Sequence, residues 1–174
     1  MPAEVRARLA EQLAPYRAQL RHARWTDPGS WHLTLVFLGQ VEPGRLALLQ
    51  ALVDTAAAAA AAYHVRADVG DGRLSRGVGV GWLGLSQGAG RLIGLAAAIA
   101  RRCPPGVTTG PPPQRTPSAH LTLVRKADRA SIDALRSQAL GPLGVEWEVD
   151  RIWLLRSHLA AAGAHYQTLH EATL

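Results

Sequence analysis

The pentapeptide His-Leu-Thr-Leu-Val occurs twice in this chain, at residues 32–36 and again at residues 120–124. Chance recurrence of an identical pentapeptide in a chain of this size is on the order of one percent, so the repeat indicates two related halves. Both copies are rich in residues that favour strands, and Gly39 follows the first one closely. The repeat therefore predicts two similar lobes, each contributing one strand to a shared cleft.

Side chains alternate between the two faces of a strand, so each copy has one polar and one apolar face. His32 shares a face with Thr34, and His120 shares a face with Thr122. The members of each pair lie about 6–7 Å apart along their strand. If the leucines are buried, we expect the four polar side chains to point into the cleft.

The rest of the chain alternates helical and extended patterns, which predicts an α+β fold with mainly antiparallel strands. We interpret residues 1–174 as a single bilobal domain. The segment 103–118 carries six of the eleven prolines and predicts a surface loop. The expected helices span residues 3–21, 43–62, 89–102 and 130–140, and the expected strands span residues 31–38, 63–69, 77–85, 119–125, 145–157 and about 165–171.

The composition is that of a water-soluble protein with enough apolar residues for a core, 48% hydrophobic and 18% charged. No stretch approaches the roughly 20 apolar residues that a membrane-spanning helix needs. The first residues resemble a charged amphipathic helix rather than a signal peptide. Cys103 is the only cysteine, which excludes an internal disulfide and a cysteine metal cluster. We expect a cytoplasmic monomer that does not contact a membrane.

The net charge is +6, and Lys126 is the only lysine. The planar guanidinium of arginine suits phosphate, so the excess favours an anionic ligand such as nucleic acid. An overall bias toward Arg, Ala and Gly explains the charge equally well, so charge alone decides nothing. Glycines at every second position of residues 77–81, with a further one at 84, match neither a phosphate-binding loop nor the dinucleotide fingerprint.

Two imidazoles and two hydroxyls around one point suit phosphodiester chemistry. A neutral histidine takes a proton from water while a protonated one gives a proton to the leaving alkoxide. The hydroxyls hold the non-bridging oxygens, where negative charge grows. This scheme needs no cofactor, and His-x-Thr supplies no acidic ligand or familiar metal spacing, so we expect no metal.

Structural roles compete with these functional ones. A single histidine on a strand is most often structural, and Thr34 and Thr122 are also good strand formers. The repetition favours function, because the threonine follows its histidine at the same spacing in both copies. Arg125 beside a cleft has the alternative role of neutralising the surface. The five tryptophans are expected in the core, and a base-stacking residue is best sought near Trp31 or in the proline-rich segment.

With Phe37-Leu38-Gly39 after the first copy and Arg125 soon after the second, the chain resembles the 2H phosphoesterase superfamily. It is most similar to the RNA 2′,3′-cyclic phosphodiesterase branch, formerly called 2′-5′ RNA ligases. The resemblance implies a bilobal α+β fold with two mainly antiparallel sheets, flanking helices and a central cleft. It also implies metal-independent opening of 2′,3′-cyclic phosphates on RNA ends to 2′-phosphates, with weak reversible 2′-5′ ligation.

The resemblance also implies a role for each site residue. His32 would be the general acid and His120 the general base. Thr34 and Thr122 would bind the phosphate oxygens, and Arg125 would add a positive charge beside them. The chain departs from the family pattern twice. A short hydrophobic strand commonly precedes the first helix, and its absence here is expected to expose a sheet edge. Ser118-Ala119 also replaces the Arg-Pro pair frequent before the second histidine.

Two other classes of function stay open. The same chemistry suits a small cyclic nucleotide, ADP-ribose cyclic phosphate or a 2′-5′ linked oligonucleotide. A module that binds RNA ends without turnover is the third possibility. The paired histidines argue against it, because a binder needs positive charge but not two titrating groups.

Overall fold

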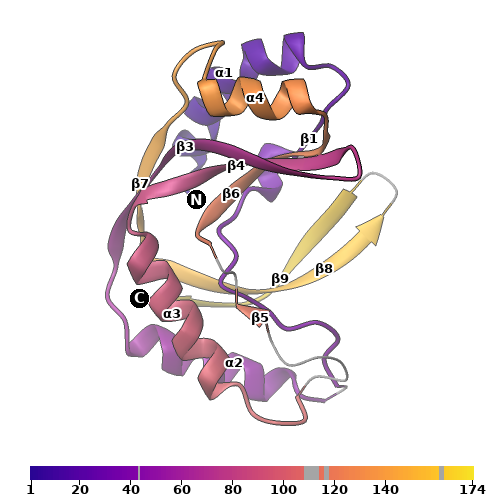
Figure 1. Ribbon diagram of the computed structural model, residues 1–174. Helices are drawn as coiled ribbons and strands as arrows, with labels where there is room; N and C mark the ends of the chain where they lie inside the picture. The colour runs from indigo at the N-terminus through magenta and orange to yellow at the C-terminus, as the bar shows by residue number, and fades with distance from the viewer. Residues whose placement is uncertain (43, 108–113, 116–117, 161–162) are drawn as a thin grey trace. The chain divides into compact units, whose positions relative to one another are not determined.

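The computed structural model describes residues 1–42, 44–107, 114–115, 118–160 and 163–174. The chain forms two compact units, and each is assembled from segments distant in sequence (Figure 1). None of the described helices is long and apolar enough to cross a membrane. The first unit comprises Met1–Leu33, His64–Gly88 and Ala119–Trp147, and the second comprises Thr34–Tyr63, Ala89–Ser118 and Glu148–Leu174.

The first unit is built on a curled five-stranded sheet with the strand order β1-β6-β4-β3-β7. The pairs β1–β6, β6–β4 and β4–β3 are antiparallel. The elements are α1 (Ala3–Gln19), β1 (Arg24–Trp25), the 3-10 turn η1 (Pro28–Ser30), β3 (Tyr63–Ser75), β4 (Val78–Gln87), β6 (His120–Ala127), α4 (Arg129–Ser137) and β7 (Val145–Val149).

Glycines of β4 determine which face of this sheet the helices cover. A Cβ atom at Gly79 would lie 2.8 Å from the Cδ1 atom of Ile132, and one at Gly81 would lie 2.5 Å from Cδ1 of Leu135. Both neighbours belong to α4, so the missing side chains let this helix approach the strand. The residues between and after the glycines, including Trp82, point to the opposite face.

Helix α1 lies on the same face as α4 (Figure 1). Val124 of β6 contacts the Cβ position of Gly81 and so faces α4, and Trp25 stands directly across from Val124. The guanidinium of Arg17 in α1 lies 5.8 Å from the Trp25 ring centroid. The other face of the sheet, called the open face below, therefore carries neither helix.

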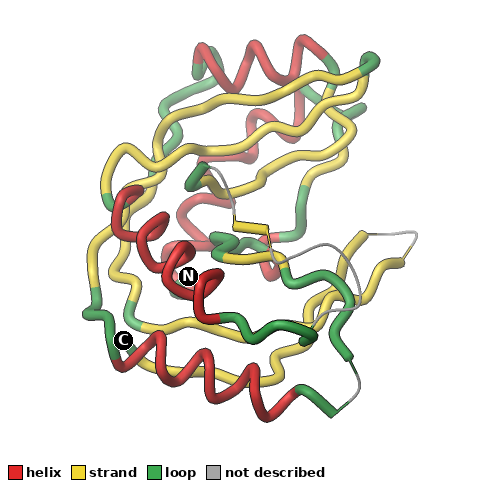
Figure 2. The backbone as a smooth tube through the Cα atoms, turned by 60° about the horizontal axis from the view of Figure 1, so that its bottom comes forward, coloured by secondary structure: helices red, strands yellow, loops and turns green. Residues whose placement is uncertain are grey.

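The described part of the second unit contains two helices, a long hairpin and a short strand pair, which Figure 2 traces. Its core is a cluster of buried side chains contributed mainly by the helices and the hairpin: Leu49, Leu52, Val53, Ala56, Ala57, Leu95, Ile99, Val107, Ile152 and Leu154. The elements are β2 (Val36–Phe37), α2 (Leu46–Ala58), α3 (Ala89–Arg102), β5 (Gln114–Arg115), β8 (Arg151–Ala160) and β9 (Gly163–Thr173).

The α+β class and the four helices are confirmed, but two expected strands are not continuous. The strand expected over residues 145–157 divides at Asp150 into β7 and β8. Within residues 31–38, Leu33 forms an isolated bridge with Leu121, and Val36–Phe37 pairs with β5. The strand is interrupted because the chain leaves the first unit after Leu33 and enters the second.

Other bounds differ as well. Helix α2 ends at Ala58 rather than residue 62, and β3 runs on to Ser75 because it pairs with β4 as far as the turn at Arg76 and Gly77. Part of the segment expected as a surface loop forms β5, whereas residues 108–113 and 116–117 lie outside the described chain.

One edge of β6 is covered in part by segments that precede the second unit. Strand β1 pairs with Val124 and Arg125, and the backbone N–H of Thr26 donates to the carbonyl oxygen of Leu123 at 2.8 Å. The bridge from Leu33 reaches the same edge at Leu121. These contacts reduce the length of edge that is open to pairing with another chain.

Candidate active site

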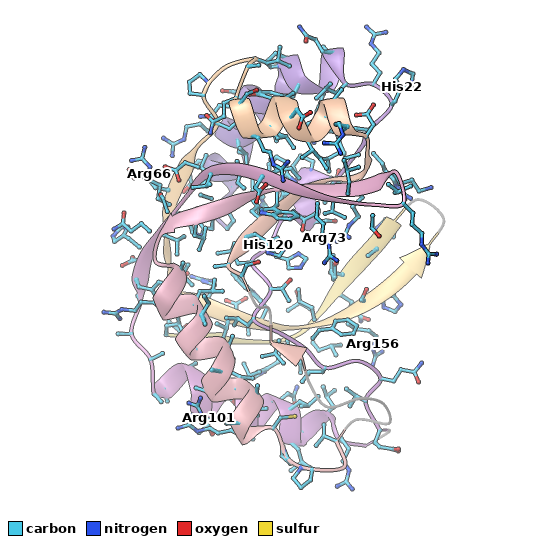
Figure 3. The ribbon with its side chains drawn as sticks, in the orientation of Figure 1. His22, Arg66, Arg73, Arg101, His120 and Arg156 are labelled. Atoms are coloured by element: carbon cyan, nitrogen blue, oxygen red, sulfur yellow. The ribbon has the colours of Figure 1, made fainter. Side chains whose placement is uncertain are left out.

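The second motif lies on β6, inside the five-stranded sheet. His120 stands across from Gly84, and Thr122 stands across from Trp82. Residues directly opposite each other in an antiparallel pair point to the same face. His120 and Thr122 therefore project from the open face, as Figure 3 shows for His120. Leu121 is fully buried on the other side, as the alternation predicts.

A β-bulge brings Arg125 onto the same face. Simple alternation from His120 would turn Arg125 toward the side of Leu121. The pairing with β4 shifts between Thr122 and Val124, however, which adds one residue to β6. Val124 then faces the helices, and Arg125, across from Val80, faces outward and is exposed.

His32 reaches the same region through the bridge between Leu33 and Leu121. In this antiparallel register the residue before Leu33 stands across from the residue after Leu121, so His32 faces Thr122 on the open face. The preceding turn is fixed by Asp27, whose side chain accepts from the backbone N–H of Gly29 at 2.8 Å. Trp31, the residue between this turn and His32, is buried.

The imidazole of His32 is held by the backbone of the preceding turn. Its Nδ1 lies 2.8 Å from the carbonyl oxygen of Ser30. A carbonyl only accepts, so Nδ1 carries the hydrogen and donates, and Nε2 is the nitrogen that takes up or releases a proton. This arrangement fixes both the tautomer and the ring orientation.

Burial lowers the pKa of His32 below its ordinary value, and the positive charges of Arg125 and of protonated His120 lower it further. The hydrogen bond to Ser30 opposes this shift, because it favours the charged ring. His120 and Arg125 therefore both act electrostatically on His32. Before substrate binds, His32 favours the neutral form.

Trp82 contacts the second histidine directly. The centroids of the Trp82 and His120 rings lie 5.4 Å apart, with the ring planes tilted by 50°. This is within the range of favourable aromatic pairs. Sequence reasoning missed this residue, because tryptophans were expected in the core. Gly79 and Gly81 were the available signal, since they mark the face on which a helix packs and so put Trp82 on the other face.

Four predicted site residues, His32, His120, Thr122 and Arg125, thus share the open face of the first unit. Both histidines belong to the first unit, whereas residues 34–36 of the first motif belong to the second. The cleft shared by two lobes stays a prediction. Thr34 is the first residue of the second unit, and its position beside the others stays a prediction. Within the described parts of the chain, no group of three or more His, Cys, Asp or Glu side chains is placed to hold a metal ion.

Comparison with known proteins gives the class to which this fold belongs. The model of the 2′-5′ RNA ligase superfamily matches residues 2–161. A crystal structure of Escherichia coli LigT complexed with 3′-AMP is 26% identical, with a TM-score of 0.75, and the match covers 100% of this chain and 93% of that one. TT0787 of Thermus thermophilus is also 26% identical, with a TM-score of 0.73 and the same coverage.

A LigT structure complexed with NADP+ is 25% identical, with a TM-score of 0.73, over 100% of this chain and 93% of that chain. A search of curated proteins finds no match. The fold is that of the LigT-like 2H phosphoesterases. The chain belongs to the 2′-5′ RNA ligase superfamily.

Proposed function

We propose that this protein hydrolyses 2′,3′-cyclic phosphates at RNA ends to 2′-phosphates, without a metal ion or other cofactor. The main support is that His32, His120 and Arg125 project from one face of the sheet. Two titrating groups beside a fixed positive charge fit acid–base chemistry on an anionic phosphodiester. Membership of the superfamily supports the phosphoesterase class.

In the proposed reaction, His120 accepts a proton from a water molecule as the water oxygen attacks phosphorus. The bond between phosphorus and the ribose 3′ oxygen breaks, and protonated His32 gives a proton to that oxygen through Nε2. The products are a free 3′ hydroxyl and a 2′-phosphate. The Ser30 carbonyl supports this role of His32, because its hydrogen bond to Nδ1 favours the protonated ring.

The substrate itself supplies the charge that favours the acid form of His32. The pKa of His32 is lowered by burial and by nearby cations, which disfavours the acid form before binding. A cyclic phosphate is anionic and raises the pKa of a neighbouring imidazole. Binding therefore promotes protonation of His32 where it is needed. Thr122, Arg125 and Thr34 are proposed to hold the phosphate oxygens.

The reverse reaction joins RNA ends through a 2′-5′ bond, and we propose it as a weak side activity. In that direction the acid and base exchange roles. Small cyclic nucleotides, ADP-ribose cyclic phosphate and 2′-5′ oligonucleotides suit the same chemistry. The similar LigT structures with 3′-AMP and with NADP+ favour a nucleotide ligand. We propose that the protein acts in the cytoplasm, as a monomer.

The test is turnover of a short RNA that ends in a 2′,3′-cyclic phosphate, with EDTA present and ATP absent. The wild type is compared with His32→Ala and His120→Ala, and the product is examined for a 2′- or 3′-phosphate. The matched control is His158→Ala, which removes an exposed imidazole from the second unit. Circular dichroism establishes that each variant is folded.

We expect the wild type and His158→Ala to form the 2′-phosphate. The two site variants should lose at least about 10²-fold in kcat/KM, the usual contribution of one acid–base group. A folded wild type that leaves the RNA intact contradicts the proposal. If that protein still binds the RNA end, the non-catalytic binding module is the better explanation.

A further inference from the structure

Three arginines form a row across the open face, next to the proposed site. Arg24 of β1 stands across from Arg125 of β6, Arg125 stands across from Val80 of β4, and Val80 stands across from Arg73 of β3. Directly opposite residues share a face, so all three arginines project to the side of the sheet that carries His120. Figure 3 shows Arg73 and His120 on this side.

The row lies at a defined distance from the reacting groups. On β4, Val80 lies two residues from Trp82, which stands across from Thr122. Two residues of a strand cover about 6–7 Å. The row therefore lies about 6–7 Å from Thr122, measured along the strands. It crosses four strands, and neighbouring strands are about 4.8 Å apart.

Like charges directly opposite each other destabilise a strand pair, and Arg24 and Arg125 stand directly opposite each other here. Within the described residues, neither Arg73 nor Arg125 forms an ion pair with an acid. The acids nearest to the row along the chain have other partners. Asp71 receives a hydrogen bond from Nε of Arg136 at 2.7 Å, and Asp128 accepts from the hydroxyl of Ser131 at 2.6 Å. The row therefore presents positive charge that the fold does not neutralise at Arg73 and Arg125.

We propose that this arginine row binds the backbone phosphate adjoining the reacting end of an RNA strand, so that the protein prefers oligonucleotide ends to cyclic mononucleotides. The inference rests on the proposed function and specifies its substrate class. An anion of extended form suits the row, because three guanidinium groups spread over several strands exceed what one cyclic phosphate can contact. Contacts from arginine to phosphates supply affinity without base preference.

The experiment compares kcat/KM for two substrates with the same terminal base: a short RNA ending in a 2′,3′-cyclic phosphate, and the 2′,3′-cyclic mononucleotide. The variants are Arg24→Gln, Arg73→Gln and the double substitution. Arg73→Lys keeps the charge at that position. Arg8→Gln is the matched control, because it removes an exposed charge from α1 on the other face of the sheet.

We expect the wild type to prefer the oligonucleotide, and each Gln variant to lower the ratio of the two kcat/KM values about tenfold, as the loss of a charged hydrogen bond does. Arg73→Lys should recover part of the ratio, and Arg8→Gln should keep it. The slope of log kcat/KM against log salt for the RNA should fall in magnitude by about 0.7 for each arginine lost.

The two proposals fail in different ways. If both substrates are hydrolysed and the ratio is the same in the wild type, the Gln variants and Arg8→Gln, the arginine row is not a subsite and the proposed function stands. If the folded wild type hydrolyses neither substrate, the proposed function fails, and the subsite fails with it.

Discussion

The rings of Trp82 and His120 lie with their centroids 5.4 Å apart and their planes tilted by 50°. The indole projects from the strand beside β6, from the position across from Thr122. A large flat side chain at that position limits the rotamers available to the imidazole. The orientation of the proposed general base thus depends on a neighbouring strand as well as on its own.

Replacement of Trp82 by Leu removes this contact while keeping an apolar side chain on the open face. An aromatic pair contributes about 0.5–1.5 kcal/mol beyond its buried area, so we expect kcat/KM to fall by up to about tenfold. Trp82→Phe should retain most of the activity, because a ring remains. Steady-state kinetics of both variants check this, and equal loss in both would count against a positioning role of the ring contact.

Arg125 is expected to control the protonation of His32. Because Arg125 contributes to the lowered pKa of His32, Arg125→Gln should raise that pKa toward 6.5. Inorganic phosphate should raise it in the wild type as well, since an anion favours the imidazolium. NMR titration of the His32 ring measures both shifts. An unchanged His32 titration curve in the variant would show that Arg125 is too distant or too screened to act on the imidazole.

The same lowered pKa makes the stability of the first unit depend on pH. The unfolded chain takes up a proton on His32 near pH 6.5, whereas the folded chain does so only at lower pH. The unfolded state therefore binds more protons in this window, and stability decreases as the pH falls from about 7 through the folded pKa of His32. The carboxyl groups with lowered pKa values, such as Asp71 and Asp128, titrate well below this range.

Urea unfolding at pH 7.5 and pH 5.5 tests this dependence. His32→Gln should lose less stability than the wild type between the two conditions, because it has no proton to gain at this position. His158→Gln is the control. It removes an exposed histidine whose Nε2 lies 3.2 Å from Oε1 of Gln167. The same loss in the wild type and in His32→Gln would refute the linkage.

Gly70 tests the close approach of α4 to the sheet. A Cβ atom at this position of β3 would overlap the carbonyl oxygen of Leu135, which is backbone and cannot rotate away. Gly70→Ala should therefore lower the free energy of unfolding by about 1–3 kcal/mol, as overpacking does. Gly94→Ala in α3 has open space around its Cβ and should stabilise by up to about 1 kcal/mol. Denaturant unfolding distinguishes the two, and a neutral Gly70→Ala would mean that α4 can shift.

Much of the fold could be predicted from the sequence because it depends on local patterns. The four helices and the strand that contains His120 follow from periodicity and strand preference, which neighbouring residues alone express. The break after Leu33 could not be predicted, because Val36 and Phe37 have the same strand preference as the residues before them. The two parts of the segment differ in their pairing partners, because Leu33 bridges to Leu121 whereas Val36 pairs with β5.

The sequence by itself determined the candidate site, because the repeated His-Leu-Thr-Leu-Val contains the proposed reacting groups and alternation puts His120 and Thr122 on one face. Only the tertiary structure decided which other side chains lie on the same face as these groups. The bulge in β6 turns Arg125 to the side of His120, and the cross-strand pairing aligns it with Arg24 and Arg73. Register and bulges arise from contacts between strands that are distant in the chain, so a local sequence pattern cannot predict either of them.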